Sequence, residues 1–221
     1  MNNFSCIIAA GGSGTRFDKN KKKQYYELNG KPILNNTIDL FYTHDEINEI
    51  IIALPQEDIT FIAKMLESEY PHKIKTIIGG KTRKESIYNA LLSCDISNHF
   101  VIIHDAVRPF FDQNDLWEMM KIVQNTNAVI PGTKVTNTIK SVKDSKIVKT
   151  IPRHDLVEIY TPKIFSLDLI LEAHKKVADS EFDFTDDSSI LEHLGTPVTF
   201  YELKTKNIKI TTKNDINHFL G

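Results

Sequence analysis

The sequence predicts an α/β fold: a doubly wound, mostly parallel sheet covered by helices, with a projecting β-hairpin arm. Three observations support this. Short β-branched runs alternate with amphipathic stretches, the runs are apolar on both faces, and one later segment has strands with polar faces. The composition, 41% hydrophobic and 25% charged over 221 residues, excludes collagen-like, mucin-like and wholly disordered proteins.

Five apolar runs are expected to form the strands of the sheet. They are residues 6–10, 49–54, 74–78, 100–104 and 127–131. Helices are expected between them, near residues 33–43, 57–69, 83–93 and 113–125. In the second helix, Ile59, Ile62 and Leu66 mark one buried stripe. A doubly wound sheet binds its ligand at the carboxyl ends of the strands.

Residues 134–151 have a different pattern, because their apolar side chains are scattered among Thr and Lys around a polar turn at Lys143-Asp144-Ser145. An isolated hairpin is marginal in water, so this arm needs a partner surface, either the body of the fold or another subunit. Helices near 166–178 and 186–194, strands near 197–203 and 207–212, and a short terminal helix are expected to follow. We predict one domain over residues 1–221, with 134–152 as the arm.

Charge and patterning exclude several classes of protein. Lys and Arg total 27 against 29 Asp and Glu, so a molecule-wide positive field for nucleic acid is absent. No apolar run approaches the roughly 18–20 residues that span a bilayer, and the N-terminus lacks a signal-peptide pattern. Cys6 and Cys94 stand alone in apolar surroundings, which predicts core residues. We expect a cytoplasmic protein that binds neither nucleic acid nor membrane.

Five of the nine glycines fall in two loops directly after predicted strands: Gly11, Gly12 and Gly14 in the first, Gly79 and Gly80 in the second. Glycine allows positive φ and a close approach of the backbone to a ligand, with N–H groups free to bind an anion. Cations follow the first loop, namely Arg16, Lys19, Lys21, Lys22 and Lys23. A glycine turn followed by cations predicts a cradle for a polyphosphate.

Two other kinds of nucleotide site are disfavoured for the first loop. No P-loop string occurs, and a dinucleotide site is disfavoured because Phe17 replaces its third glycine and the second strand ends at Ala53-Leu54-Pro55 without an acid. The loop read as a simple glycine turn beside a solvated lysine run remains an alternative.

A series of motifs in chain order resembles the 2-C-methyl-D-erythritol 4-phosphate cytidylyltransferase family of isoprenoid biosynthesis, to which the ribitol-5-phosphate cytidylyltransferases are close relatives. The motifs are Ala10-Gly11-Gly12-x-Gly14-x-Arg16, Lys23-Gln24, Gly79-Gly80-x-x-Arg83-x-x-Ser86, His104-Asp105-Ala106-Val107-Arg108-Pro109, Ile151-Pro152-Arg153, Thr161-Pro162, Thr185-Asp186 and Asn207-Ile208-Lys209-Ile210-Thr211. The resemblance implies a Rossmann-like nucleotidyltransferase fold.

The resemblance also implies a reaction, in which a phosphate oxygen of the acceptor attacks the α-phosphorus of CTP and pyrophosphate leaves. It assigns catalytic cations to Arg16, Lys23 and Lys209. It assigns CTP binding to Ala10, Gly11, Gly12, Ser13, Gly14, Thr15, Gly79, Gly80, Arg83, Ser86, Asp105 and Ala106. The alternative is that these cations are ordinary surface residues.

Asp105 ends a predicted strand, where a lone carboxylate suits Mg²⁺, and the resemblance assigns that ion, or another divalent cation in its place, to Asp105. A helix N-cap or a salt bridge to Arg108 is the alternative. The resemblance assigns acceptor binding to Arg108, Thr138, Arg153, Thr161 and Thr185. It places Thr138 and Arg153 in the arm of a neighbouring subunit, which implies a homodimer with exchanged arms. His104 is interpreted as structural.

Two positions depart from the usual pattern of the family. Lys22 stands where proline usually precedes the Lys-Gln pair, and we expect it to add charge beside the triphosphate. Tyr160-Thr161-Pro162-Lys163 replaces the usual Gln-Thr-Pro-Gln, near the expected acceptor pocket. The favoured acceptor is 2-C-methyl-D-erythritol 4-phosphate. Ribitol 5-phosphate or another polyol phosphate is the alternative, and a non-catalytic nucleotide-binding protein is a third interpretation.

Overall fold

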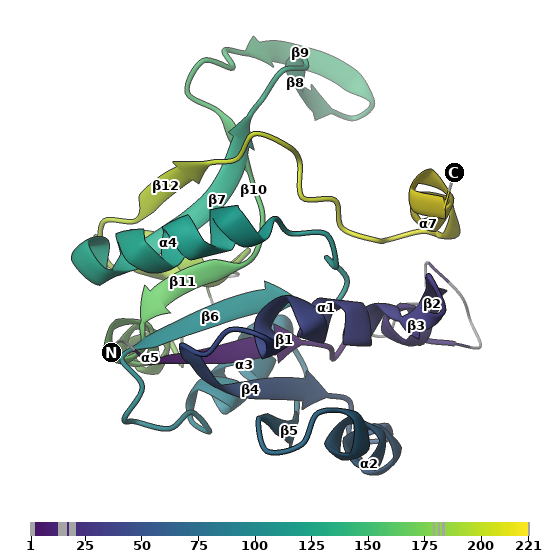
Figure 1. The fold of residues 1–221 in the computed structure, drawn as a ribbon. Helices are drawn as coiled ribbons and strands as arrows, with labels where there is room; N and C mark the ends of the chain where they lie inside the picture. Colours follow the sequence, from purple (N-terminus) through teal and green to yellow (C-terminus); the bar gives the residue numbers. More distant parts are fainter. Residues whose placement is uncertain are drawn as a thin grey trace.

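The computed structural model describes residues 3–12, 17, 21–178, 180, 182 and 184–220, with the backbone alone for 217–220. Its centre is an eight-stranded sheet in the order β10-β7-β11-β6-β1-β4-β5, with β12 added to β7 (Figure 1). The strands are β1 (Phe4–Ala9), β4 (Ile47–Leu54), β5 (Ile74–Ile78), β6 (Phe100–Asp105), β7 (Ala128–Lys134), β10 (Val157–Ile159), β11 (Lys163–Ser166) and β12 (Thr199–Glu202).

The expected mostly parallel sheet is confirmed. β1 pairs in parallel with both β4 and β6, and β4–β5 and β7–β12 are parallel as well. β11 lies antiparallel between β6 and β7, and β10 is antiparallel to β7. Both antiparallel strands are only three or four residues long, and the sequence analysis missed them.

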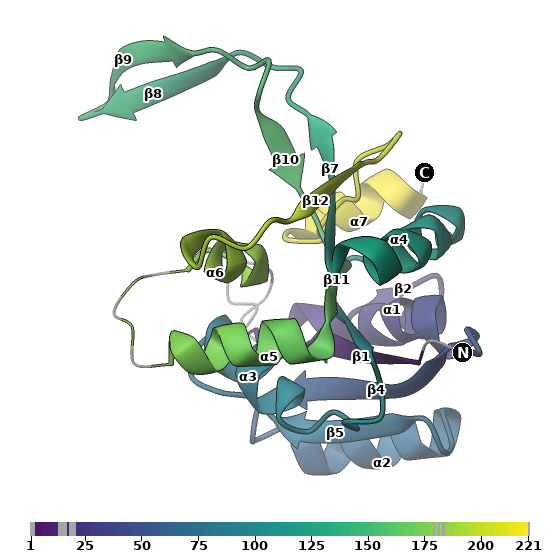
Figure 2. The ribbon, with the colours of Figure 1, turned by 90° about the vertical axis from the view of Figure 1, so that its left-hand side faces the viewer.

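Helices cover both faces of the sheet (Figure 2). One core contains apolar side chains of α1 (Ile33–Tyr42), α2 (Ile59–Glu69) and α4 (Gln113–Thr126), and the other contains those of α3 (Arg83–Leu91), α5 (Leu167–Lys176) and α6 (Asp187–His193). Neighbouring residues of β1 point to opposite faces, as the period of a strand requires: Cys6 lies in the first core and Ile7 in the second. Cys6 and Cys94 are buried and free, as predicted.

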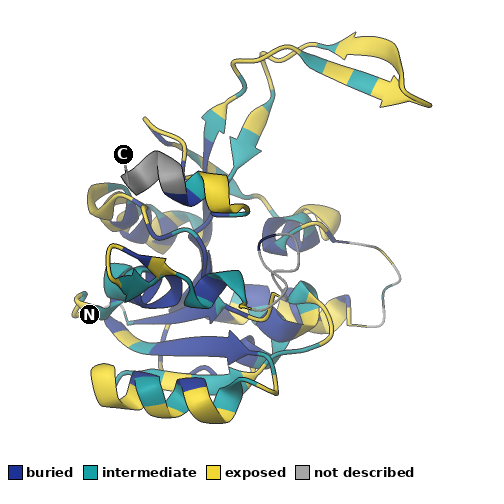
Figure 3. Ribbon diagram, turned by 90° about the vertical axis from the view of Figure 1, so that its right-hand side faces the viewer, coloured by how far each residue is buried: buried dark blue, intermediate teal, exposed yellow. Residues whose placement is uncertain are grey.

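The arm consists of β8 (Ile139–Lys143) and β9 (Lys146–Ile151), which pair only with each other. It extends away from the sheet in Figures 1 and 2, and nearly all of it is exposed in Figure 3. Val142, Ile147 and Val148 leave 59%, 66% and 60% of their surface to solvent. The predicted hairpin is therefore confirmed, and its apolar side chains do not reach the body of this chain.

The strand expected at residues 207–212 is wrong. These residues belong to an irregular segment, residues 204–212, that we call the C-terminal strap, which leads to α7 (Lys213–Leu220). The Ile210 amide donates to the Val107 carbonyl at 2.9 Å, but no sheet ladder forms along the strap. A 3-10 turn, η1 (Lys23–Tyr25), and a small hairpin, β2 (Glu27–Leu28) with β3 (Lys31–Pro32), were not predicted. Among the described helices none is long and apolar enough to cross a membrane.

Candidate active site

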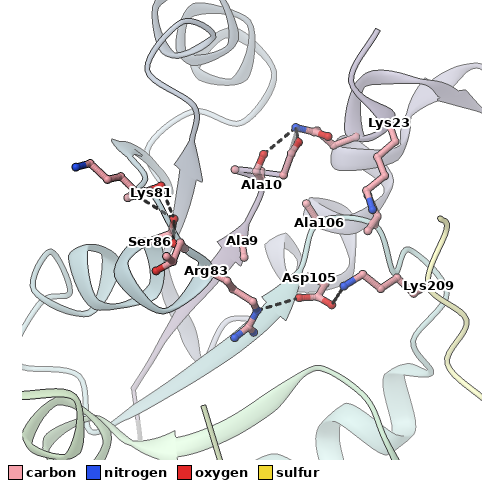
Figure 4. Close-up of a pocket in the computed structure, with 15 residues that line it drawn as sticks. Ala9, Ala10, Lys23, Lys81, Arg83, Ser86, Asp105, Ala106 and Lys209 are labelled. Atoms are coloured by element: carbon pink, nitrogen blue, oxygen red, sulfur yellow. Dashed lines mark hydrogen bonds and ion pairs between the residues drawn. The ribbon is translucent and has the colours of Figure 1, made fainter. Parts of the chain in front are cut away.

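A pocket of about 380 Å³ opens at the carboxyl ends of β1 and β6, the edge predicted for a doubly wound sheet (Figure 4). Its walls come from the loops after β1, β5 and β6, from η1 and from the C-terminal strap. It is lined by Ala9, Ala10, Gly11, Gly12, Lys23, Gln24, Gly80, Lys81, Thr82, Arg83, Ser86, Asp105, Ala106, Val107 and Lys209. Ten of these residues were assigned to catalysis or CTP binding from the sequence.

The glycines of the loop after β5 are required by close packing. A Cβ at Gly79 would stand 3.0 Å from the Ser86 hydroxyl, and one at Gly80 would stand 2.2 Å from the Glu85 side chain. Ser86 Oγ accepts from the Gly80 amide at 2.9 Å and donates to the Thr82 carbonyl at 2.8 Å. Among the described glycines, only Gly30 and Gly195, both outside these loops, have positive φ. The described glycines of the two loops therefore do not adopt the expected positive φ, and their close approach to a ligand stays a prediction.

Asp105 is the electrostatic centre of the pocket. Its carboxylate accepts a hydrogen bond from the Lys209 amine at 2.8 Å. The same carboxylate lies 3.6 Å from Arg83 Nε and 3.4 Å from Arg108 Nε. Burial would raise the pKa of Asp105, but the charges of Lys209, Arg83 and Arg108 outweigh burial and hold that pKa well below its usual range. The salt bridge to Arg108, which the sequence offered as an alternative to a magnesium site, is present, and Asp105 remains ionised beside the other two cations as well.

Beneath Asp105, His104 is fully buried on β6, and burial lowers its pKa to about 4. The Nε2 atom of His104 lies 3.0 Å from the Arg108 carbonyl oxygen. A neutral imidazole can donate a hydrogen bond to this oxygen, because one of its two ring nitrogens carries a proton. The interpretation of His104 as a structural residue agrees with this environment.

Gln24 is a site residue that the sequence analysis did not predict. It is buried directly after Lys23, and its Nε2 donates to the Ala10 carbonyl at 2.8 Å and to the Gly12 carbonyl at 3.3 Å. Gln24 therefore joins η1 to the first glycine loop and helps to set where Lys23 meets the pocket. Its place in the Lys-Gln motif was visible, but its burial was not.

A second ionic group joins α6 to the pocket. Arg83 Nη1 contacts Asp187 Oδ2 at 2.8 Å, so this guanidinium bridges two carboxylates. Asp186 caps α6 by accepting from the Ser189 amide at 2.8 Å, and it also pairs with the buried amine of Lys163. Asp187 was missed because its partner lies 104 positions away in the sequence.

The structure brings together only some of the expected acceptor residues. Arg108 contacts Asp105, and the Thr161 hydroxyl accepts from the Asp105 amide at 3.1 Å. Thr185 is exposed and lines a small hollow beside Arg83. Thr138 and Arg153 lie exposed at the base of the arm and do not line the pocket. Ser13, Gly14, Thr15 and Arg16 lie outside the described residues.

Comparison with known proteins decides the family. The model of the 2-C-methyl-D-erythritol 4-phosphate cytidylyltransferase family matches residues 4–219. The chain belongs to this family.

Relatives named as 2-C-methyl-D-erythritol 4-phosphate cytidylyltransferase are similar over nearly their whole length. That of Clostridium beijerinckii is 40% identical, covering 96% of this chain and 94% of the relative, and that of Clostridioides difficile is 37% identical, covering 97% and 91%. The crystal structure of 4-diphosphocytidyl-2C-methyl-D-erythritol synthase from Anaerococcus prevotii has a TM-score of 0.87 at 32% identity, covering 99% of this chain and 96% of that chain. The Francisella tularensis cytidylyltransferase has a TM-score of 0.85 at 32% identity, covering 99% of both chains.

Lys22, the first departure from the usual family pattern, has a role that differs from the expected one. The Lys22 amine contacts Glu57 at 2.6 Å and Asp58 at 2.7 Å, beside the start of α2. Lys22 lines a separate hollow with these acids and does not line the pocket that contains Lys23 and Asp105. The prediction that Lys22 adds charge beside the triphosphate is therefore wrong for this structure.

The second departure, Lys163, also has an internal partner. Its side chain is 2% exposed and pairs with Asp186 at the start of α6. A buried lysine is tolerated in proteins when an opposite charge accompanies it, and Asp186 supplies that charge here. Lys163 thus joins β11 to α6.

The pocket offers one carboxylate, that of Asp105, as a candidate ligand for a magnesium ion. Mg²⁺ commonly takes one or two protein carboxylates and completes its shell with water and substrate phosphates. Asp105 supplies one ionised carboxylate at the pocket wall. Over the described ranges no group of three or more His, Cys, Asp and Glu side chains could enclose a metal ion, so an all-protein cage is not what these residues offer.

Proposed function

We propose that this chain transfers the cytidylyl group of CTP to 2-C-methyl-D-erythritol 4-phosphate, giving 4-diphosphocytidyl-2-C-methyl-D-erythritol and pyrophosphate in the non-mevalonate isoprenoid pathway. The observation that carries the proposal is the meeting of Lys23, Lys209 and Asp105 with two glycine loops in one pocket. The family to which the chain belongs supplies the chemistry.

In this reaction an oxygen of the acceptor phosphate forms a bond to the α-phosphorus of CTP, and the bond from that phosphorus to the oxygen bridging to the β-phosphate breaks. Negative charge grows on the leaving pyrophosphate, so positioning and electrostatic stabilisation do most of the work. Lys23 and Lys209 both line the pocket and provide positive charge on the side away from Ser86 (Figure 4). A magnesium ion held by Asp105 would supply further charge neutralisation on the phosphates.

The two glycine loops are suited to the nucleotide. Gly11 and Gly12 offer backbone that can approach the triphosphate. Gly80 is held against α3 by its hydrogen bond to Ser86, and Gly79 packs beside the same hydroxyl. We assign base and ribose recognition to this second loop with Ser86 and Arg83. Arg83 is oriented by Asp187 at 2.8 Å, which reduces the entropy lost when the guanidinium meets a ligand.

We assign the acceptor phosphate to Arg108, Thr161 and Thr185 of one chain and to Thr138 and Arg153 of a second. The proposal of a homodimer with exchanged arms is supported by the exposed apolar side chains of β8 and β9, which find no cover on the body of their own chain. CTP as substrate favours a cytoplasmic location.

The decisive experiment measures pyrophosphate release by the purified protein with CTP and Mg²⁺. 2-C-methyl-D-erythritol 4-phosphate and ribitol 5-phosphate are compared in parallel, each with and without a chelator of divalent cations. We expect a strong preference for the first acceptor and loss of turnover with the chelator. Preference for ribitol 5-phosphate would overturn the proposed acceptor, and turnover unaffected by the chelator would overturn the magnesium assignment.

A further inference from the structure

The C-terminal strap carries Lys209 into the pocket without the support of a strand ladder. A sheet would fix each residue through regular backbone hydrogen bonds, but the strap is held at separate points. After Lys209, the Ile210 amide is bonded to Val107 and the Ile210 side chain is fully buried. Before Lys209, Lys206 makes an exposed ion pair with Glu158 at 2.9 Å, and exposed pairs contribute little.

Asn207 is the buried polar anchor on that side of Lys209. Only 4% of its surface is exposed, and its Nδ2 donates to the Thr161 carbonyl at 2.6 Å. Its own carbonyl accepts from Arg108 Nη1. Through these bonds one residue connects the strap to Thr161 and Arg108, both of which also contact Asp105.

We propose that Asn207 is a positioning residue that sets where the Lys209 amine lies relative to Asp105 and the bound phosphates. The inference rests on the proposed function, because it concerns the same transfer reaction. Lys209 follows Asn207 by two residues, so a shift of the strap at Asn207 moves the base of the Lys209 side chain directly. A displacement of about 1 Å is enough to cost roughly a hundredfold in a reaction that depends on positioning.

The test is a set of four proteins: the wild type, Asn207→Ala, Lys209→Met and the double variant. Turnover is measured at saturating CTP and acceptor. If Asn207 acts through Lys209, Asn207→Ala lowers kcat at least tenfold in the wild type and less than twofold in the Lys209→Met background. An equal loss in both backgrounds, or normal turnover of Asn207→Ala, would overturn the proposal.

Asn35 provides a matched control. It is also buried, its Nδ2 also makes a hydrogen bond of 2.6 Å, here to Glu69, and its Oδ1, like that of Asn207, finds no partner among the described residues. Asn35 lies on α1, outside the pocket. We expect Asn35→Ala to lower thermal stability about as much as Asn207→Ala while kcat stays within twofold of the wild type.

Hydrogen exchange at the Ile210 amide tests the anchor without any turnover. We expect exchange at this amide to accelerate in Asn207→Ala and to stay unchanged in Asn35→Ala, and equal exchange in all three proteins would overturn the proposal. The proposed function and the positioning role of Asn207 can fail separately. A wild type that is silent with both acceptors counts against the proposed function, whereas an active wild type with unchanged Ile210 exchange in Asn207→Ala counts against this inference alone.

Discussion

The pocket and the arm of this chain are built in opposite ways. Pocket residues are held by their own chain: Asp105 is buried among three cations, and Gln24 and Ser86 each hold a glycine loop in place. In the arm, β8 and β9 pair only with each other and leave their apolar side chains in water. A single chain can therefore preorganise the pocket, whereas in the proposed dimer the residues of the arm would join a site of the second chain.

The largest expected effect is in the pocket. Lys23→Met removes a charge from the phosphate site and should lower kcat roughly 10²–10³-fold, the cost of losing one preorganised electrostatic contact. Lys22→Met is the matched control, because the Lys22 amine contacts Glu57 and Asp58 instead. Turnover is measured by pyrophosphate release, with circular dichroism to verify folding. Similar losses in the two variants would contradict the separation of these neighbouring lysines.

The buried interior beneath the pocket should respond to acid. Burial lowers the pKa of His104 to about 4, so between pH 6.5 and 4 the unfolded chain binds a proton that the folded chain excludes. The free energy of unfolding therefore decreases as the pH is lowered through this window, and His104 contributes on the order of 2–3 kcal/mol to the decrease. Urea unfolding at pH 7 and pH 4.5 measures it. His104→Gln should lose correspondingly less unfolding free energy between pH 7 and pH 4.5. An equal loss in the wild type and in His104→Gln would contradict the assignment of this acid sensitivity to His104.

A change in the arm should affect the acceptor alone. Arg153→Ala should raise KM for the acceptor about 10–100-fold, the range of a hydrogen bond to a charged group, and change KM for CTP less than about twofold. Steady-state kinetics with each substrate varied in turn provide the measurement. Equal changes in both KM values would mean that Arg153 supports the fold or the nucleotide site.

Mixing variants sharpens this comparison between arm and pocket. In an arm-exchanged dimer, a Lys23→Met chain paired with an Arg153→Ala chain contains one intact site and one doubly defective site. The assay uses an acceptor concentration well below the wild-type KM, at which sites that carry Arg153→Ala are nearly silent. Random exchange of subunits should then restore about a quarter of the wild-type activity, because half the dimers are mixed and each has one good site. No recovery after demonstrated subunit exchange would contradict the shared site.

A substitution on the exposed surface of the arm should have the smallest effect on folding. Val148 leaves 60% of its surface in solvent in the single chain, so Val148→Asp should change the unfolding free energy of the monomer by less than about 0.5 kcal/mol. It should nevertheless weaken the dimer, because a charge would enter the proposed interface. Sedimentation across a dilution series measures the second effect, and denaturation at high dilution measures the first. Destabilisation of the monomer would contradict the description of the arm as a surface element.

Elements with a clear period could be predicted well from the sequence. The strand expected at 74–78 has those bounds in the structure, and the helix expected at 33–43 ends one residue earlier. The strand expected at 207–212 failed although Ile208 and Ile210 alternate with polar residues, because a strand also needs a neighbouring edge to pair with. Ile208 is 43% exposed there, so the alternation does not reflect a sheet face.

The layers of the fold, the two glycine loops and the residue types of the site could be predicted from the sequence, because periodicity and motif spacing act over short stretches of chain. Which distant groups meet depends on how the whole chain folds and could not be predicted in this way. The cations around Asp105 come from positions 83, 108 and 209, and their charges set its pKa through distances of a few ångströms. The partners of Gln24, Asp187 and Asn207 were decided in the same way, because burial and hydrogen bonding depend on neighbours brought together by folding.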